Sequence, residues 1–344
     1  MPQQERIFYL DFVRAFATVL IVLTHYNALF LYNISPPDAS KGILFTYIGG
    51  VYIGTVGVAL FLIISGAAFT YVYHDKKLEL GKFFKKRFMS IYPMYWIAYI
   101  ITFFINFWEN AGIQQGIPKK NIFFSVLGID TYVANYGIRT FATVGEWFIG
   151  LIVIIYIAYP LIKYLFEKAP ILLIIAVTVG YYISVYFSCK YVNPLRWFLV
   201  FVFGMFFFKY IKSVNSWCAI GAVGVIFVNN KIKIIQIHQF EDLYISLCVF
   251  VILVYLSRLL ERINIKKICG VICKYSYPCF LVHHFIIYQI TKKFDLNNIS
   301  RADNACLFVL CCVIIVIFSK GLYMLDQLIQ KYLKETSYKK SSLN

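Results

Sequence analysis

Long apolar segments recur along this chain of 344 residues, and they set the class of fold that it can adopt. Three of them read TVLIVLTHYNALFLY, ALFLIISGAAFTYVY and LFVLCCVIIVIF. A helix needs about 20 apolar residues to cross the roughly 30 Å of hydrocarbon in a bilayer. Only 14% of the residues are charged, whereas a soluble domain carries about 25%. The sequence therefore predicts an all-α fold, a polytopic membrane bundle of helices that has the lipid bilayer as its solvent.

Hydropathy predicts about ten transmembrane helices in this bundle. They cover residues 7–31, 48–73, 88–108, 141–163, 170–188, 195–210, 215–230, 242–259, 270–291 and 304–325. We expect one transmembrane domain of residues 1–330, followed by a short basic tail of residues 331–344.

The distribution of Lys and Arg predicts the orientation, because these residues are enriched in cytoplasmic loops. With the N-terminus in the cytoplasm, 21 of the 33 basic residues lie in inner segments and 11 in outer ones, and Arg14 lies within the membrane. We therefore expect a multi-pass protein of the plasma membrane with both termini in the cytoplasm.

The net charge of +17 does not predict a nucleic-acid partner, because most of the bases fall in loops where topology accounts for them. The nine cysteines lack the paired spacing of a metal site, so no metal is expected. The longest outer loop, about residues 109–140, mixes Gly, Gln and Asn with apolar residues. Its apolar content favours a loop that lies back over the mouth of the bundle.

The first apolar segment carries two polar side chains eleven positions apart, Arg14 and His25. Eleven residues make three helical turns plus about 20°, so both side chains leave nearly the same face, roughly 16 Å apart along the axis. A charge at this depth costs several kcal/mol unless it faces the bundle interior. The pattern predicts a long site with a proton-handling group at its outer end. The alternative is a structural ion pair between Asp11 and Arg14, with His25 as an interfacial histidine.

A basic segment, GKFFKKRFMSIYPMYW, precedes the third span and ends in a Tyr-Pro pair, which we expect to form a turn that opens this span. Ammonium and guanidinium groups at a cytoplasmic membrane edge suit phosphate recognition, and Arg87 is able to bind a phosphate with two hydrogen bonds. Contact with lipid headgroups is the alternative interpretation, and for Lys85 and Lys86 it is the better one.

Three further residues lie at matching depths. His283, in the ninth span, is expected near the depth of Arg14, and its neighbour His284 points about 100° away. Ser65 belongs to the second span, whose small residues allow close helix packing. Glu146 begins the fourth span level with His25, where a carboxylate is able to fix the tautomer of His25 or join in proton transfer. A solvated glutamate at a loop edge is the other interpretation.

These segments together resemble the acyltransferase-3 family of integral membrane acyltransferases, over about residues 6–325. Arg14 and His25 match the R-x10-H signature of that family, and GVALFLIISGAAF is similar to its second-span motif. FFKKRFMSIYPMYW, WFIGLIVIIYIAYP and SYPCFLVHHFII resemble three more of its motifs in the same order. The chain departs from the family pattern at Ser90, where members often carry a base, and at Ala59, where many carry Asp.

The resemblance implies a membrane O-acyltransferase that moves an acyl group, most often acetyl, from cytoplasmic acyl-CoA to a hydroxyl of a surface polysaccharide or lipid-linked glycan. It implies His25 as catalytic base with Glu146 beside it. The residues expected to hold acetyl-CoA are Arg14, Ser65, Lys86, Arg87 and His283.

Two other classes of function stay open at this point. Intramembrane Arg, His and Asp also suit a transporter or exporter of glycans or small molecules, although the sequence shows no repeat of two halves. A structural or assembly subunit is the third class, and the sequence leaves the oligomeric state open, a homo-oligomer included.

Overall fold

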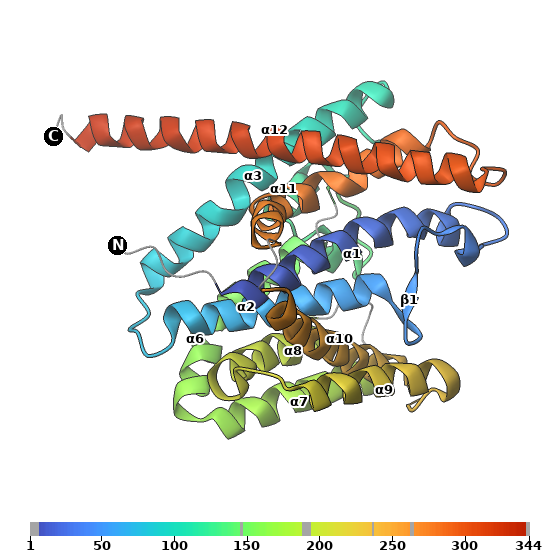
Figure 1. Cartoon of the computed structure of the whole chain (residues 1–344). Coiled ribbons are helices and arrows are strands. Elements are labelled where there is room, and N and C mark those ends of the chain that lie inside the picture. Colours follow the sequence, from blue (N-terminus) through green and yellow to red (C-terminus); the bar gives the residue numbers. More distant parts are fainter. Residues whose placement is uncertain (1–6, 145–146, 188–193, 236, 262–264, 342–344) are drawn as a thin grey trace. The chain divides into compact units, whose positions relative to one another are not determined.

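The computed structural model describes residues 7–144, 147–187, 194–235, 237–261 and 265–341, and nearly all of its regular structure is helical (Figure 1). The longer helices are α1 (Phe8–Tyr32), α2 (Ile53–Tyr73), α3 (Leu80–Glu109), α6 (Trp147–Lys168), α7 (Pro170–Tyr186), α8 (Leu195–Phe206), α9 (Ser216–Ile232), α10 (His238–Leu260), α11 (Lys266–Thr291) and α12 (Arg301–Ser341). The shorter elements are η1 (Ala39–Lys41), β1 (Tyr47–Ile48), β2 (Val51–Tyr52), η2 (Lys119–Asn121), α4 (Ile122–Leu127), α5 (Asp130–Ala134) and a π turn, η3 (Phe207–Ile211).

The helical class is confirmed, and each predicted span overlaps one of the longer helices. Within the part of the chain that the structure describes, six helices are long and apolar enough to cross a membrane: α1, α2, α3, α6, α10 and, over Arg301–Tyr332, α12. The apolar helices α7 and α9 are shorter than that. The number of about ten spans therefore stays a prediction.

The third span begins earlier than the sequence indicated, and the expected Tyr-Pro turn is wrong. Helix α3 begins at Leu80 and includes the whole basic segment, with Pro93 inside it. Proline removes one backbone hydrogen bond from a helix. A membrane helix tolerates the missing hydrogen bond where groups of neighbouring segments satisfy the freed backbone carbonyl. Here Tyr92 and Tyr95, on either side of Pro93, both donate hydrogen bonds to the segment that follows α3.

Two other boundaries also differ from the expectation. The second helix begins at Ile53 rather than at 48, because residues 47–52 form a small antiparallel hairpin of β1 and β2. Its two-residue turn, Gly49 and Gly50, has φ of +56° and +85°, which a right-handed helix cannot contain. At the other end of the chain, the expected basic tail is helical as far as Ser341.

Contacts divide the chain into two compact units, described here one at a time. The first takes in the described parts of Met1–Leu78, Ile154–Ser276 and Phe294–Phe308. The second takes in those of Glu79–Val153, Tyr277–Lys293 and Val309–Asn344. A single transmembrane domain for residues 1–330 stays a prediction.

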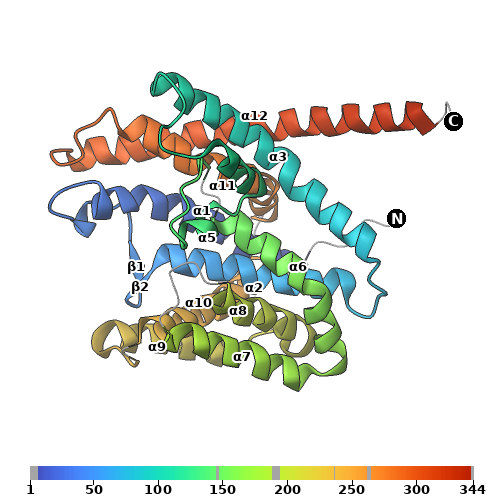
Figure 2. The same ribbon diagram turned by 180° about the vertical axis from the view of Figure 1, so that it is seen from behind.

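In the first unit, helix α2 packs between α1 and α8, and glycines set the spacing. A side chain at Gly66 would collide with the backbone carbonyl of Phe201, and one at Gly204 with that of Ile63. Each glycine therefore lies directly against the backbone of the other helix. The expected close packing by small residues of the second span is confirmed. Helices α7 and α8, and α9 and α10, form further packed pairs of this unit (Figure 2).

In the second unit, the long segment after α3 folds back onto that helix. The Tyr92 hydroxyl donates to the carbonyl of Leu127 at 3.1 Å, and the Trp96 indole donates to that of Val126 at 2.9 Å. The Tyr99 hydroxyl donates to the carbonyl of Phe141 at 3.0 Å. Aromatic residues of α3 thus satisfy backbone carbonyls of the loop.

Ser125 makes the hydrogen bonds that hold separate parts of this loop against α3 and against one another. Its carbonyl accepts a hydrogen bond from Tyr95, and its hydroxyl donates to the carboxylate of Asp130. The same hydroxyl accepts a hydrogen bond of 3.1 Å from the backbone N–H of Phe141. Ser125 and Asp130 are both buried, at 0% and 2% exposed. One residue, through its carbonyl and its hydroxyl, therefore connects α3, α4, α5 and the segment that returns to α6.

We predict that Gly204→Ala destabilises the protein, because the new methyl group would press on the backbone of Ile63, which cannot turn aside as a side chain can. Overpacking typically costs about 1–3 kcal/mol. The measurements are the apparent Tm in detergent and the yield of monodisperse protein. Gly221→Ala on α9 is the matched control, because nothing lies within 4 Å of its added carbon. Equal Tm values for the two variants would contradict the packing described.

We predict that Ser125→Ala loosens the loop that follows α3. Loss of the hydroxyl leaves Asp130 and the Phe141 N–H without their shared partner, at a cost of about 1–3 kcal/mol for a buried group. Limited proteolysis with trypsin should then cut faster at Lys119, Lys120 or Arg139. Thr131→Ala removes a hydroxyl from the same loop and serves as control. A cleavage rate equal to that of the control would rule out the joining role of Ser125.

Candidate functional site

Helix α1 carries both Arg14 and His25, and it runs from Phe8 to Tyr32 with neither proline nor glycine inside it. The sequence-based geometry therefore applies: the two residues lie about 16 Å apart along the axis and close to one face. Both side chains are half-buried. The carbonyl of Arg14 also accepts a hydrogen bond of 2.8 Å from Thr18.

The end of α1 that carries His25 is fixed by the residues on either side of it. The carbonyl of Thr24 accepts a hydrogen bond of 3.0 Å from the Tyr52 hydroxyl. The Tyr26 hydroxyl donates to the carbonyl of Asn304, on the first turn of α12, at 3.0 Å. Asn27, 1% exposed, donates to the carbonyl of Ile43 at 3.1 Å. The residues next to His25 are thus fixed to the β1–β2 hairpin, to α12 and to the loop after α1, which holds this end of the helix in place.

Two other predicted residues belong to the same unit. Ser65 is half-buried on α2, next to Gly66 at the crossing with α8. Asp11 is half-buried on the first turn of α1, and its carbonyl lies 3.1 Å from the Cys273 sulfur on α11. Pairing of Asp11 with Arg14 stays a prediction.

In the second unit, the basic residues of α3 differ from one another in their surroundings. The Lys86 side chain is exposed, whereas Arg87 is half-buried. The guanidinium of Arg87 lies 5.9 Å from the ring centre of Phe83, one turn earlier on the helix and 3% exposed. This cation–π contact orients the planar guanidinium of Arg87, whereas a lysine would carry only a point charge on a flexible stem. Ser90, the departure from the family pattern, donates a hydrogen bond of 2.8 Å to the carbonyl of Arg87.

His283 on α11 is 2% exposed, and its Nδ1 lies 2.8 Å from the carbonyl of Phe280 and 3.1 Å from that of Cys279. A carbonyl oxygen only accepts, so Nδ1 is the nitrogen that carries hydrogen. In the neutral ring, Nε2 is then the acceptor. His284 is exposed, so the expectation that the adjacent histidines point in different directions is confirmed.

The predicted catalytic partner, Glu146, lies outside the described residues. Of the other predicted residues, Asp11, Arg14, His25 and Ser65 belong to the first unit and Lys86, Arg87 and His283 to the second. A site built from both groups stays a prediction.

The structure also pairs residues that the sequence did not single out. The Arg196 guanidinium binds the carboxylate of Asp242, between α8 and α10, and lies 5.2 Å from the Trp197 ring centre. The pair borders a small cavity that is also lined by Ala59, the second departure from the family pattern. Arg196 and Asp242 are 46 positions apart, so no local pattern would have joined them.

A cluster of possible ligands lies where α2 ends beside α6, and the sequence did not indicate it either. His74, Asp75 and Glu167 place ligand atoms within 4.8 Å of one another. The ammonium of Lys163 already lies 2.6 Å from the Glu167 carboxylate. Because Glu167 is already paired with Lys163 and lies 3.5 Å from the His74 ring, the cluster is best described as a network of ion pairs.

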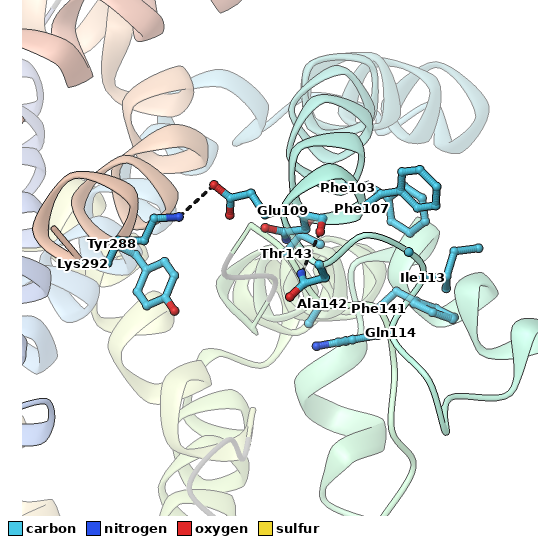
Figure 3. A pocket seen from close by; sticks show the side chains of 13 residues that line it. Phe103, Phe107, Glu109, Ile113, Gln114, Phe141, Ala142, Thr143, Tyr288 and Lys292 are labelled. Carbon is cyan, nitrogen blue, oxygen red and sulfur yellow. Dashed lines mark hydrogen bonds and ion pairs between the residues drawn. The ribbon is translucent and has the colours of Figure 1, made fainter.

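A polar cavity of about 450 Å³ lies in the second unit, at the end of α3, and it too was missed (Figure 3). The Glu109 carboxylate at its rim accepts hydrogen bonds from Lys292 at 2.8 Å and Gln289 at 2.9 Å. The side chains of Asn106, Gln114, Thr143 and Tyr288 also line it. The Asn- and Gln-rich composition of residues 106–115 was the available signal, but it did not show which residues would converge.

Comparison with protein families agrees with the motifs. The model of the acyltransferase-3 family, described as an acyltransferase domain, matches residues 7–324. Neither curated proteins nor solved structures gave a match. The match takes in nearly the whole chain, including α1 with Arg14 and His25, the basic start of α3 and α11 with His283. The chain therefore belongs to the acyltransferase-3 family.

Proposed function

We propose that this membrane acyltransferase takes an acetyl group from acetyl-CoA at the cytoplasmic face. It transfers the group to a hydroxyl of a surface polysaccharide or a lipid-linked glycan. The observation that carries the proposal is the unbroken helix α1, which presents Arg14 and His25 about 16 Å apart near one face. An extended phosphopantetheine arm is of similar length. The nucleotide is then able to stay on the cytoplasmic side while the thioester reaches His25.

In the proposed reaction, the imidazole of His25 accepts the proton of the acceptor hydroxyl as its oxygen attacks the thioester carbonyl. The tetrahedral intermediate collapses, the carbon–sulfur bond breaks, and the thiolate of CoA takes up the proton from the imidazolium. General-base catalysis of this kind contributes about 10²–10⁴-fold in rate. The rigid surroundings of His25 support the role, because a base acts only within hydrogen-bond reach of the proton. Glu146 is proposed as the carboxylate that orients the ring.

Donor binding is proposed for the residues on α3 and α11 together with Arg14 and Ser65. Arg87, held against Phe83, is suited to a bidentate contact with a phosphate, with Lys86 as a more mobile second charge. His283 has its Nδ1 hydrogen committed to backbone carbonyls. Its Nε2 is therefore suited to accept a hydrogen bond from an amide N–H of the pantetheine arm.

A transporter was the main alternative, since intramembrane charges also suit a translocation path. Family membership does not favour it. A transporter would leave the thioester of acetyl-CoA intact, so the release of free CoA by the purified protein separates the two functions.

We predict that His25→Ala folds and binds acetyl-CoA but retains less than about a tenth of wild-type turnover at saturating donor and acceptor, because the variant lacks the base. The measurements are turnover and an acetyl-CoA binding isotherm on the same sample. Retention of more than that fraction, or loss of donor binding alongside turnover, would contradict the catalytic role. Glu146→Gln should cause a smaller loss if this residue orients His25.

We predict that Arg87→Ala weakens acetyl-CoA binding about tenfold or more, since a hydrogen bond between charged groups contributes about 1.5–3 kcal/mol. Turnover at saturating donor should change less than the affinity. Lys82→Ala is the control: Lys82 lies one turn earlier on α3 and is paired with Glu79 at 2.7 Å. Equal affinity in the two variants would assign Arg87 to lipid headgroups instead. Arg87→Lys tests whether the bidentate fork, rather than the charge alone, is needed.

A further inference from the structure

The polar cavity at the end of α3 has two kinds of lining. Asn106, Gln114 and Thr143 supply amide and hydroxyl groups, which both donate and accept hydrogen bonds. Phe103, Phe107 and Tyr288 supply aromatic surface. In Figure 3, Tyr288 comes from α11 on one side, and the phenylalanines come from α3 on the other. Sugars present the same combination, hydroxyl groups around the ring and apolar C–H groups on its faces.

The charges at the cavity do not suit a phosphate-bearing ligand such as CoA. Among the lining residues that the structure describes, Lys292 is the one base, and Glu109 already neutralises it at 2.8 Å. A phosphate group would meet the Glu109 carboxylate as well as the ammonium. A neutral ligand that binds through hydroxyl groups pays no such penalty. The volume of about 450 Å³ falls within the ~300–1,000 Å³ of typical small-molecule sites.

The cavity lies at the opposite end of α3 from Arg87. The 22 positions from Arg87 to Glu109 belong to one continuous helix. They rise about 33 Å, which is close to the ~30 Å of the hydrocarbon core of a bilayer. The basic residues proposed to bind the donor and the polar cavity therefore occupy two ends of a single membrane-length helix.

We infer that this cavity binds the saccharide whose hydroxyl group is acylated. Gln114, Asn106 and Thr143 hold its hydroxyl groups, and the ring of Tyr288 packs against a sugar face. The Glu109–Lys292 pair fixes the end of α3 to the end of α11 and so sets the width of the cavity. This inference rests on the proposed function, because the saccharide is named as the acceptor.

The first experiment measures saccharide binding directly. Saturation-transfer NMR on the purified full-length chain would use N-acetylglucosamine, galactose and N-acetyllactosamine as probes. We expect saturable binding of at least one probe, weakened about tenfold by Gln114→Ala or Tyr288→Ala, which corresponds to about 1.4 kcal/mol. The matched controls are Gln115→Ala, at the next position, and Tyr136→Phe, at an exposed tyrosine of the same loop; both should bind as wild type does. No saturable binding by the wild type, or equal binding by all variants, would overturn the inference.

The second experiment separates this inference from the proposed function. Membranes that contain the natural glycan are incubated with labelled acetyl-CoA, and donor affinity and labelled glycan are both measured. We expect the Gln114 and Tyr288 variants to raise the KM for acceptor with unchanged donor affinity. A matching loss of donor affinity would make the cavity part of the donor site and overturn the inference. If the wild type transfers no acetyl group but the variants still lose probe binding, the proposed function fails, and the cavity stands as a saccharide site without an acceptor role.

Discussion

Backbone groups within a bilayer have no water to bind, so each N–H and C=O must find a partner inside the protein. Most of this chain meets the requirement with helices. The segment between α3 and α6, the predicted outer loop, is held in another way, because aromatic side chains of α3 donate hydrogen bonds to its carbonyls. Tyrosine and tryptophan suit this role, because each is apolar enough for a membrane helix and still carries a hydrogen-bond donor. The polar cavity exists because the segment is held in this way.

The first unit is held together in part by close packing between helix backbones. At the crossing of α2 and α8, Gly66 and Gly204 leave no room for a side chain. In hydrocarbon, helices gain little from the hydrophobic effect, and dispersion contacts between close backbones replace it. Ser65 and the α1 side of α2 are positioned by this crossing. The position of the candidate site residue Ser65 thus depends on two glycines that have no reactive side chain.

The sequence predicted the helical class and the approximate place of each long helix, because hydropathy over some 20 residues is a strong local signal. It also predicted the separation of Arg14 and His25, which depends only on an unbroken helix. It failed where distant contacts decide the outcome. Pro93 looked like a turn, but α3 continues through it, and the hydroxyls of Tyr92 and Tyr95 bind carbonyls of the following loop, contacts that the local sequence does not indicate.

The cavity and the Arg196–Asp242 pair were missed for a related reason. Glu109 is the last residue of α3 and Lys292 directly follows α11, 183 positions later, and no periodicity relates them. The sequence indicates which residues are polar, but which of them come together around one cavity depends on the fold. The sequence predicts how residues on one helix are spaced, but it does not predict which residues of another helix they meet.

The ion pair of Glu109 and Lys292 affects how ionic strength would change the binding of the two proposed substrates, acetyl-CoA and the saccharide. Salt weakens an attraction between unlike charges and has little effect on contacts between neutral groups. If the basic residues of α3 bind the anionic donor as proposed, they would hold it less tightly as salt rises. The cavity at the other end of the helix, where the charges cancel, would hold a neutral ligand with nearly the same affinity. Under the proposed function, rising salt would therefore weaken the binding of acetyl-CoA and leave the affinity for a neutral saccharide nearly unchanged.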